Sequence, residues 1–595
     1  MSPGTRRSFA FGAAFVLAAS VLTVAPVAAQ DGDVPQGGTI VVGEWQRATQ
    51  LNPYLSNALK DVEGVRPAMR PLAAVNDEGE FVPELLAEFP TVENGGIVLD
   101  EDGDGFTLNL VMQDGLAWSD GTPLTLNDYK WNYDWATGIG ASGQVACPYC
   151  AQLVPLKDPS ITGAEGWDPS NQRIDSFEVS EDGLTAAIHF EENFAGWITM
   201  LTEIYLLSPS FWGDVALEDV ATAAAVDSPL LLDMPTSGPF KIVAAGSEGI
   251  DYEPNEFWAA DDGPNLDRLR LRFFGSKDGM FAAFLAGEID LTLNTTLADV
   301  AALQSVSPDI GRAIVDTGWQ YEHVTFNHEA SDVGLDDANV RRALAMAIDK
   351  QGLLDVLFPG AGLTPACSNA PPAQWYAAEG ITCDPYDPEL ASSLLDEAGW
   401  AVDPDLGIRA KDGNPMRIRM CTSSGNPVRL TTLGRISQDW GAISVGTDIQ
   451  TEDPSVYFGS YDETTSETDC NIYRGTFDIA LYTDQLSPDP FSDWFTSYES
   501  SQPATDDFPS GLNIARVADP VLDELVTRLG SQMTEDGIKE VAAEVSQYVV
   551  GITLEAALYY RPEPTGIGNR LGGFEKKNPS TATSLWDVEN WFVIP

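Results

Sequence analysis

Helices that begin at an Asp-Pro or Asn-Pro pair alternate with strands in the second half of this chain, and this alternation constrains the fold more than any other feature. In "DPELASSLLDEAGW", Asp387 fits the N-cap, Pro388 the first helical position and Gly399 the position just past the helix. The stretch 426–441, "NPVRLTTLGRISQDWG", repeats this arrangement. The segment "FDIALYTD" then alternates as a strand that ends at Asp484. Helices and strands in alternation predict an α/β fold around a sheet.

Two further segments support this fold class. A helix is predicted after Asp336 or Asp337, either of which can act as its N-cap. Apolar residues then follow at the spacing of a helix with one buried face, namely Val340, Ala343, Leu344, Ala347 and Ile348. The stretch "DGMFAAFLAGEIDLTLN" predicts a helix that ends at Gly287 and a strand after it, which is the helix-to-strand half of an α/β unit.

A strand, a rigid turn and a helix follow one another in "LVMQDGLAWSDGTPLTLNDYKW". Residues 106–112 alternate between apolar and polar, which predicts a half-buried strand. The run 119–123, Ser-Asp-Gly-Thr-Pro, has the residues of a tight turn. Thr125 fits the N-cap of the next helix, with Asp128 three residues on as a variant of the capping box. None of these residues is a nucleophile with a base beside it, so the stretch is interpreted as scaffold.

The length and the charge of the chain exclude several classes of protein. With 595 residues, the chain exceeds one ordinary hydrophobic core, so at least two lobes are expected. Its 90 acidic and 32 basic residues give a formal net charge of −58. A field of that sign repels nucleic acid and anionic membrane surfaces, so we expect no nucleic-acid partner.

The N-terminus predicts export from the cytoplasm. Arg6 and Arg7 precede an apolar run that ends in small residues, and we expect a signal peptide at 1–29 that is cleaved after Ala29. The arginine pair fits the twin-arginine route and an ordinary secretory signal equally. A polar linker follows at 30–38. No later run reaches the roughly 20 apolar residues that span a bilayer, so we expect a soluble protein in the periplasm, at the cell surface or in the medium.

Six cysteines fit an exported protein with disulfides. Sequence alone allows about 15 pairings, and proximity in the chain predicts Cys147–Cys150, Cys367–Cys383 and Cys421–Cys470. The tetrad Cys-Pro-Tyr-Cys at 147–150 resembles a redox site, but a Gly/Ser loop precedes it and poor helix follows, which favours a structural disulfide. The chain has only three histidines and no serine-nucleophile motif, so neither a catalytic centre nor a cofactor or metal site is predicted.

A dozen stretches of the chain resemble, in the same order, the extracytoplasmic solute-binding proteins of ABC importers, in the dipeptide, oligopeptide and nickel class called family 5. They include "GGTIVVGEWQ", "LNPYLS", "LVMQDGLAWSDGTPLTLNDYKW", "TSGPFKIV", "FAAFLAGEIDL", "VRRALAMAIDK", "YDPELASSLLDEAGW" and "FDIALYTDQLSPDP". The resemblance implies the two-lobed α/β fold of type II periplasmic binding proteins, with an extra subdomain in the first lobe. The implied parts are a first lobe at 39–318 with an inserted subdomain at about 75–230, a second lobe at 319–558, and a C-terminal return to the first lobe at 559–595.

The resemblance also implies ligand-binding residues. Arg429, in the first turn of the helix capped by Asn426, would hold a ligand carboxylate, because free backbone N–H groups and the helix dipole favour an anion there. Asp484, at the end of its strand, would hold an ammonium group. Aromatic and polar neighbours would enclose the rest of the ligand, and these are Trp45, Tyr54, Asn57, Trp319, Tyr321 and Gln485.

The expected function is therefore that of a receptor and not of an enzyme. The resemblance implies that a small peptide or a similar solute binds between two lobes, which close around it and dock on the membrane permease of an ABC importer. We expect a monomer. An oligosaccharide or a metal chelate is the alternative ligand, and a secreted redox or hydrolytic enzyme is the alternative class. Release of an unchanged ligand from the receptor, or turnover by the enzyme, would distinguish them.

Overall fold

The computed structural model of the protein describes most of the chain in several ranges. These are residues 34–56, 58–101, 104–137, 173–258, 263–296, 299, 302–303, 305–459, 461, 470–509, 511–576, 578 and 584–595. The expected signal peptide at 1–29, Asn57 and the Cys147–Cys150 tetrad lie outside the described residues.

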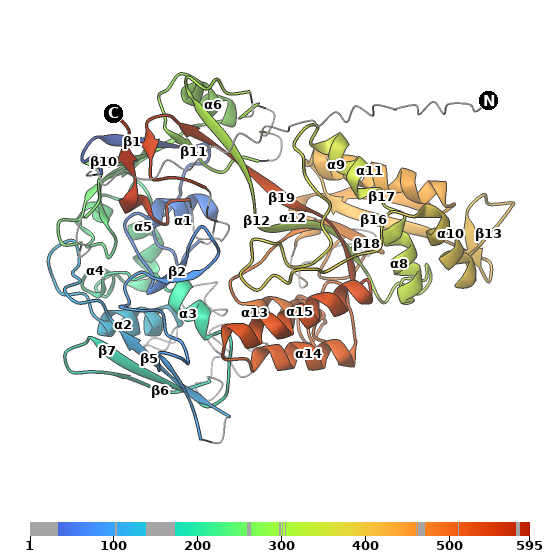
Figure 1. The fold of residues 1–595 in the computed structure, drawn as a ribbon, viewed down its shortest axis with the longest axis horizontal. Coiled ribbons are helices and arrows are strands. Elements are labelled where there is room, and N and C mark those ends of the chain that lie inside the picture. The colour runs from blue at the N-terminus through green and yellow to red at the C-terminus, as the bar shows by residue number, and fades with distance from the viewer. Residues whose placement is uncertain are drawn as a thin grey trace, which may run out of the picture.

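One ten-stranded sheet runs through both lobes, in the order β17-β16-β18-β12-β19-β11-β1-β10-β9-β8. Its two central strands, β12 (Gly311–Phe326) and β19 (Glu555–Gly568), are the longest described. They cross from one lobe to the other (Figure 1). The remaining strands are β1 (Thr39–Glu44), β8 (Phe240–Gly246), β9 (Gly249–Pro254), β10 (Arg268–Phe273), β11 (Leu291–Thr292), β16 (Arg417–Ser423), β17 (Gly446–Glu452) and β18 (Ile479–Gln485).

The pairing of the two crossing strands is interrupted between the lobes. β12 pairs antiparallel with β19 as far as Thr317 opposite Pro562, and pairing resumes at Tyr321 opposite Tyr560. Unpaired residues in one strand bend it and increase its twist. The interruption therefore bends the sheet between Thr317 and Tyr321. The bounds of the lobes, with the second beginning at residue 319, stay a prediction.

Smaller sheets and short helices complete the first lobe. The hairpin β2 (Ala73–Val75) with β3 (Phe81–Pro83) and the pair β20 (Leu571–Gly572) with β21 (Phe592–Val593) lie beside a four-stranded sheet ordered β4-β5-β7-β6. That sheet consists of β4 (Ile97–Leu99), β5 (Phe106–Val111), β6 (Ile174–Val179) and β7 (Thr185–Phe190). The helices are α1 (Leu59–Val65), α2 (Leu126–Thr137), α3 (Trp197–Glu203), α4 (Pro209–Trp212), α5 (Val220–Ala224) and α6 (Lys277–Leu285), with short 3-10 turns at Leu217–Asp219, Pro229–Asp233 and Val588–Asn590.

The strand, turn and helix predicted at 106–137 are confirmed as β5 and α2. Along β5 the buried residues alternate with half-buried ones, as expected. The backbone N–H of Thr125 donates to Asp128 Oδ2 at 2.8 Å, which is the returning half of the predicted capping box. Trp118 is buried, and its backbone N–H donates to the carbonyl of Thr122 at 2.8 Å across the turn. The stretch therefore folds as a scaffold element.

The second lobe carries most of the long helices. They are α8 (Ala338–Met346), α9 (Lys350–Leu357), α10 (Pro388–Glu397), α11 (Pro427–Ala442), α12 (Pro454–Tyr457), α13 (Pro490–Tyr498), α14 (Pro520–Gly530) and α15 (Glu535–Gly551), beside a small sheet of β13 (Ala401–Val402), β14 (Arg409–Lys411) and β15 (Asn414–Pro415). The Asx-Pro prediction is confirmed for α10 and α11, because Asp387 accepts from the N–H of Leu390, and Asn426 accepts from the N–H groups of Val428 and Arg429. Helices α13 and α14 begin in the same way.

Helices α13 to α15 pack toward the first lobe. Their buried side chains, among them Trp494 and Leu529, belong to the same hydrophobic cluster as the core of the first lobe. The ring centroids of Phe194 and Phe491 are 6.1 Å apart, and the N–H of Ala195 donates to the carbonyl of Gly530 at 3.1 Å. Figure 1 shows α13, α14 and α15 below β12 and β19 in the view, with α13 next to α3. The lobes therefore touch along this seam as well as through the crossing strands.

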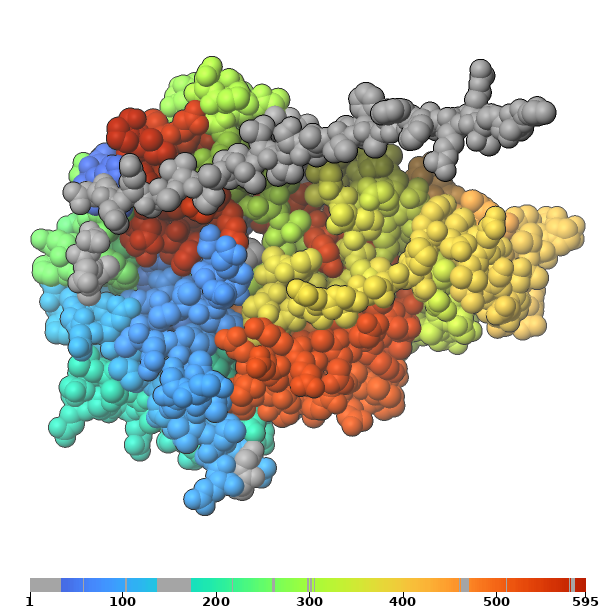
Figure 2. All heavy atoms as spheres, in the orientation of Figure 1, coloured from blue at the N-terminus to red at the C-terminus, as the bar shows by residue number. Residues whose placement is uncertain are grey.

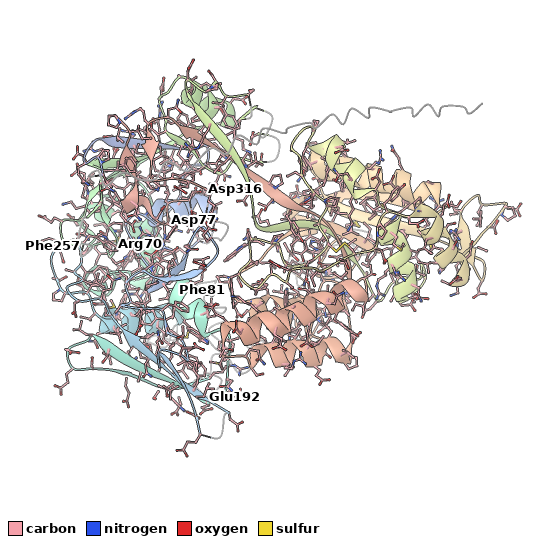
Figure 3. All side chains as sticks on the ribbon, viewed as in Figure 1. Arg70, Asp77, Phe81, Glu192, Phe257 and Asp316 are labelled. Atoms are coloured by element: carbon pink, nitrogen blue, oxygen red, sulfur yellow. A yellow bond between two sulfur atoms is a disulfide. The ribbon has the colours of Figure 1, made fainter. Side chains whose placement is uncertain are left out.

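The C-terminal segment is anchored on two buried arginines of the first lobe. Arg66 and Arg70 have fully buried side chains and form ion pairs with Glu84. Arg70, labelled in Figure 3, also pairs with Glu589 and donates to the carbonyl of Trp586. A buried guanidinium needs both a counter-charge and hydrogen-bond acceptors, so this network fixes residues 586–589 against the lobe.

Two of the three predicted disulfides lie within the described residues and are present. Cys367 bonds to Cys383, with Cα atoms 5.5 Å apart, and Cys421 bonds to Cys470, with Cα atoms 5.9 Å apart. Among the helices of the described part of the chain, none is both long and apolar enough to cross a membrane.

Candidate functional site

The candidate site lies where the second-lobe strands end, facing the first lobe. The parallel strands β16 and β18 end at Ser423 and Gln485, and the antiparallel β12 begins its second-lobe half opposite them, with Gln320 paired to Gln485. In open α/β sheets, ligands bind beyond the carboxyl ends of the strands. Figure 2 shows the two lobes in contact in the lower part of the view, with green and red atoms of the crossing segments visible in a hollow above that contact.

Arg429 reaches this edge from the first turn of α11. Its Nε donates to Glu322 Oε1 at 2.7 Å, its Nη1 to Ser423 Oγ at 3.1 Å and its Nη2 to Thr483 Oγ1 at 2.9 Å. Thr483 donates in turn to Glu322. The side chains of Arg429 and Glu322 are 11% and 4% exposed, so the guanidinium is already paired with a buried carboxylate of the protein.

This arrangement changes the role predicted for Arg429. The N-cap by Asn426 forms as expected, but the guanidinium that was expected to hold a ligand carboxylate is engaged by Glu322. The structure also does not join Arg429 directly to Asp484. It brings Arg429 to Thr483, whose side chain lies on the opposite face of β18 from that of Asp484 because neighbouring residues of a strand alternate.

Arg561 is a cation at the same edge that the sequence did not single out. It lies on β19 next to the interruption between the lobes, and its Nη1 donates to Thr483 Oγ1 at 3.4 Å. Within the described part of the chain, no carboxylate lies in ion-pair distance of its guanidinium. Its side chain is half-buried. Arg561 is therefore better placed than Arg429 to receive an anionic ligand group.

Two carboxyl groups and a tyrosine lie on the other face of the same strands. The hydroxyl of Tyr321 donates to Glu555 Oε1 at 2.8 Å and lies 3.4 Å from Asp484 Oδ2. His323 Nε2 lies 3.8 Å from a carboxylate oxygen of Asp484 and 3.8 Å from one of Glu555. Asp484 and Glu555 line a cavity of about 230 Å³ together with Tyr473, Tyr482 and Tyr498. The structure thus brings together Tyr321 and Asp484, two of the predicted ligand-binding residues, and adds Glu555.

Burial sets the protonation of this cluster. It raises the pKa of Asp484 to about 7, and the nearby carboxylate of Glu322 adds to the rise. Burial also raises the pKa of Glu555 to about 8, and the charge of Asp484 contributes. The pKa of His323 is lowered to about 3 by burial, so its imidazole is neutral. The cluster can therefore carry negative charge but supplies no cation of its own.

The predicted aromatic residues do not form an open ligand surface. Trp319 is fully buried against Val75, Leu486 and neighbours, and its indole N–H donates to the carbonyl of Ala373 at 2.9 Å. Trp45 lies in the first lobe, where its indole N–H donates to the carbonyl of Asn294 at 2.8 Å. The Nζ of Lys277 lies 5.0 Å from the centre of its ring. Both indoles are thus occupied by contacts within the protein.

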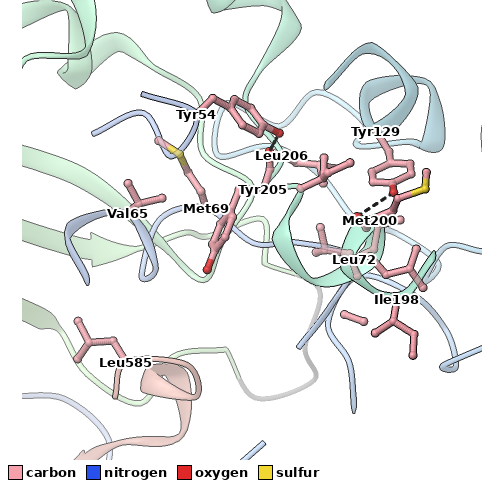
Figure 4. Close-up of a cluster of buried hydrophobic side chains, with 14 of the residues drawn as sticks. Tyr54, Val65, Met69, Leu72, Tyr129, Ile198, Met200, Tyr205, Leu206 and Leu585 are labelled. Carbon is pink, nitrogen blue, oxygen red and sulfur yellow. Dashed lines mark hydrogen bonds between the residues drawn. The ribbon is translucent and has the colours of Figure 1, made fainter. Parts of the chain in front are cut away.

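Tyr54 is a core residue, contrary to the prediction. Its side chain is 1% exposed, and its hydroxyl donates to the carbonyl of Tyr205 at 2.6 Å inside the first lobe (Figure 4). The loop "LNPYLS" turns inward because Asn52 Oδ1 accepts from the backbone N–H of Tyr54. Gln485 does lie at the site edge, where it accepts a hydrogen bond from Gln320. No group of three or more His, Cys, Asp or Glu able to hold a metal ion occurs among the described residues.

Three residues of the site were missed from the sequence. Glu322 lies 107 residues from Arg429, Glu555 lies 234 residues from Tyr321 and Arg561 lies 78 residues from Thr483, so local patterns carry no sign of these contacts. For Glu555 and Arg561 the only signal is that each is a charge in the stretch "LEAALYYRP", which is otherwise apolar or aromatic. Glu322 lies in a strand that also carries other polar residues and gives no such signal. Charged residues at such positions are rarely buried unless they are paired or functional.

Solved structures of low sequence identity share this fold over almost the whole chain. They include HbpA2 from Haemophilus parasuis, at TM-score 0.72 and 17% identity, covering 94% of this chain and all of that one. The oligopeptide-binding protein AppA from Bacillus subtilis, in complex with a nonapeptide, matches at TM-score 0.66 and 19% identity, with coverages of 94% and 100%. The class of protein that the fold defines is therefore the two-lobed type II binding protein, as predicted.

The family is shown by a sequence model. The model of the bacterial extracellular solute-binding proteins, family 5 (middle region), matches residues 80–503. The chain belongs to this family, which confirms the resemblance found in the sequence.

Curated relatives match over shorter regions. Haem-binding protein A of Haemophilus influenzae is 33% identical over 215 residues, or 36% of each chain. The oligopeptide-binding protein OppA of Lactococcus lactis subsp. lactis is 24% identical over 374 residues, or 60% of each chain. A dipeptide-binding protein of Pseudomonas aeruginosa is 26% identical over 363 residues, or 60% of this chain and 61% of that protein. The matches thus span less than two thirds of the length of these relatives.

Proposed function

We propose that the protein is the extracytoplasmic substrate-binding receptor of an ABC importer, and that it holds a peptide-like solute between its lobes for delivery to a membrane permease. Membership of family 5 and the two-lobed fold support the receptor role. The names of the relatives differ in ligand, from oligopeptide and dipeptide to haem, so the ligand class is argued from the site.

The observation that carries the peptide assignment is the presence of opposite, unpaired charges at one edge of the second lobe. Arg561 offers a guanidinium to which no described carboxylate is paired, and Thr483 beside it offers a hydroxyl. Asp484 and Glu555 offer carboxyl groups in a cavity lined by tyrosines. A peptide carries an ammonium at one end and a carboxylate at the other, so both groups can be neutralised as the lobes close.

The oligosaccharide alternative is less well supported. A sugar-binding site presents exposed aromatic faces and neutral hydrogen-bonding groups. Here the indoles of Trp45 and Trp319 are engaged within the protein. The polar groups of the site are mostly charged.

Mass spectrometry of small molecules released from the purified, denatured protein tests the proposal. The expected result is a set of peptides that disappears when the protein is first washed in partially unfolding urea, and that rebinds after refolding. Recovery of sugars or of a metal complex in their place would contradict the peptide assignment. Conversion of added peptides to new products would contradict the receptor role.

A further inference from the structure

The two carboxyl groups at the cavity share the hydroxyl of one tyrosine. Tyr321 carries a single hydroxyl proton, so it cannot donate to Glu555 and Asp484 at the same time. His323 Nε2 is 3.8 Å from both. Two carboxylates that both approach one imidazole nitrogen and one hydroxyl, with Glu555 buried and Asp484 half-buried, disfavour the state in which both are ionised. The geometry therefore favours a pair that retains a proton.

The groups around this pair supply no compensating cation. The titratable residues that face the pair are Tyr321 and His323 on β12, Tyr482 on β18, Asp493 and Tyr498 on α13, and Tyr473 before β18. Glu322 lies on the opposite face of β12 and acts on Asp484 through its charge. Lys350, Arg342 and Asp384 line a second cavity that Glu555 also lines. Within the described residues, no lysine or arginine lies in ion-pair distance of Asp484 or Glu555. Lys350 Nζ instead donates to the carbonyl of Ala366 at 3.2 Å.

We propose that the Asp484–Glu555 pair holds one proton while the site is empty and exchanges that proton for a cationic group of the ligand. The inference rests on the proposed receptor function and specifies one end of its ligand as a primary ammonium or a guanidinium. The O–H bond of the protonated carboxyl breaks, the proton leaves to water, and the ligand cation faces two carboxylates. No covalent bond to the ligand forms, and binding releases one proton.

The shape of the cavity supports a cation. Its volume of about 230 Å³ accommodates an ammonium with its attached methylenes, and the rings of Tyr473, Tyr482 and Tyr498 line it. Aromatic rings attract cations through their faces. Of the side chain of Asp484, 34% is accessible, so the carboxyl can be reached from the cavity. The raised pKa values of both carboxyls agree with retention of a proton near neutral pH.

Infrared difference spectroscopy on the full-length protein tests the retained proton without any peptide. The spectrum of the parent minus that of the Asp484→Asn/Glu555→Gln variant is expected to show the carbonyl stretch of a protonated carboxyl at neutral pH. Methylammonium chloride should remove this band, and sodium chloride at the same concentration should not. Asp448→Asn, at an exposed carboxyl on β17, is the matched control and should leave the band in place. Absence of the band, or a band indifferent to methylammonium, would overturn the inference.

Calorimetry with trialanine separates this inference from the proposed function. Binding measured in two buffers of different ionisation enthalpy is expected to show the release of one proton. Below neutrality, affinity should therefore fall by up to about tenfold for each unit by which the pH is lowered, because a higher proton concentration opposes the release. Trialanine that binds without proton release would overturn the exchange and leave the peptide function standing. If methylammonium removes the infrared band but the protein does not bind trialanine, the peptide function would be overturned. The exchange of a proton for a cation would then still be supported.

Discussion

Arg429 Nε donates to Glu322 Oε1 at 2.7 Å, and this ion pair joins the first turn of α11 to the crossing strand β12. Both side chains are nearly buried, and Ser423 and Thr483 accept hydrogen bonds from Nη1 and Nη2 of Arg429. The pair therefore fixes the edge of the second lobe on which the ligand would rest. It also determines what a mutation at Arg429 reports.

Arg429→Met should lower the free energy of unfolding by about 3–5 kcal/mol, because it leaves Glu322 as an unpaired buried charge. The double variant Arg429→Met/Glu322→Leu should recover most of this loss, since well-packed apolar side chains can replace a buried ion pair. Urea denaturation of the parent, the single variant and the double variant, all without ligand, measures the loss and the recovery of the free energy of unfolding. Equal losses in the single and double variants would show that the pair contributes no coupling.

Arg561→Gln should weaken the binding of trialanine by at least tenfold, and by about 2–5 kcal/mol if the ligand carboxylate is fully desolvated. Its melting temperature should stay close to that of the parent, because no described carboxylate depends on this guanidinium. Carboxyl-amidated trialanine should bind the parent poorly and lose little more on the substitution. Arg417→Gln, at an exposed arginine at the far end of β16, is the control. Unchanged affinity in Arg561→Gln would remove Arg561 from the site.

The stability of the protein should depend on pH through Asp493. Burial, with the nearby Asp489, raises the pKa of this carboxyl to about 8. The folded state therefore keeps a proton that the unfolded state has already released, and the free energy of unfolding falls as pH rises toward 8. Asp493→Asn still accepts from the N–H of Ser487 but cannot titrate. Relative to the parent, it should gain up to about 1.4 kcal/mol per pH unit between about pH 5 and 8, measured by urea denaturation. If the free energies of unfolding of the parent and of Asp493→Asn changed with pH in the same way, Asp493 would not be the group responsible.

The two disulfides should differ in their resistance to reduction. Cys383 is exposed and Cys367 half-buried beside a cavity, whereas Cys421 and Cys470 are fully buried. Because a thiolate must reach the sulfur it attacks, mild reductant should open Cys367–Cys383 first. Alkylation of the freed thiols followed by mass spectrometry measures the order in which the two disulfides are reduced. Earlier labelling of Cys421 would mean that the second-lobe core opens more readily than the surface loop.

Closure of the lobes should be sensitive to Phe81. Its ring centroid lies 5.2 Å from that of Trp375, on the side of the first lobe that faces α13–α15 (Figure 3). Such a pair contributes about 0.5–1.5 kcal/mol beyond burial, and it contributes only when the lobes touch. Phe81→Ala should therefore enlarge the radius of gyration of the unliganded protein in small-angle scattering, and excess ligand should restore the parent value. An identical profile for both proteins without ligand would show that the seam does not hold the lobes together.

Local chemistry in the sequence predicted the scaffold well. The caps at Asp387 and Asn426, the capping box at Thr125 and the strand that ends near Asp484 were all found, because each depends on residues within one turn or one strand. The site was predicted less well. The role predicted for Tyr54 was wrong because a loop that turns inward has the same composition as an exposed loop. The ion pair of Arg429 could not be predicted because strand pairing brings Glu322 to it from 107 residues away.

The anchoring of residues 586–589 on Arg66 and Arg70 has a consequence for how the protein is made. The second lobe is one continuous stretch between the crossing strands, so its core can form as soon as that stretch is synthesised. The first lobe must wait for its C-terminal part, because without Glu589 and the carbonyl of Trp586 the buried guanidinium of Arg70 keeps only Glu84, which it shares with Arg66. A ribosome that stops early would therefore release a chain with a finished second lobe and an unfinished first lobe. Such a chain would expose uncompensated charge and apolar surface to the proteases that remove incomplete proteins.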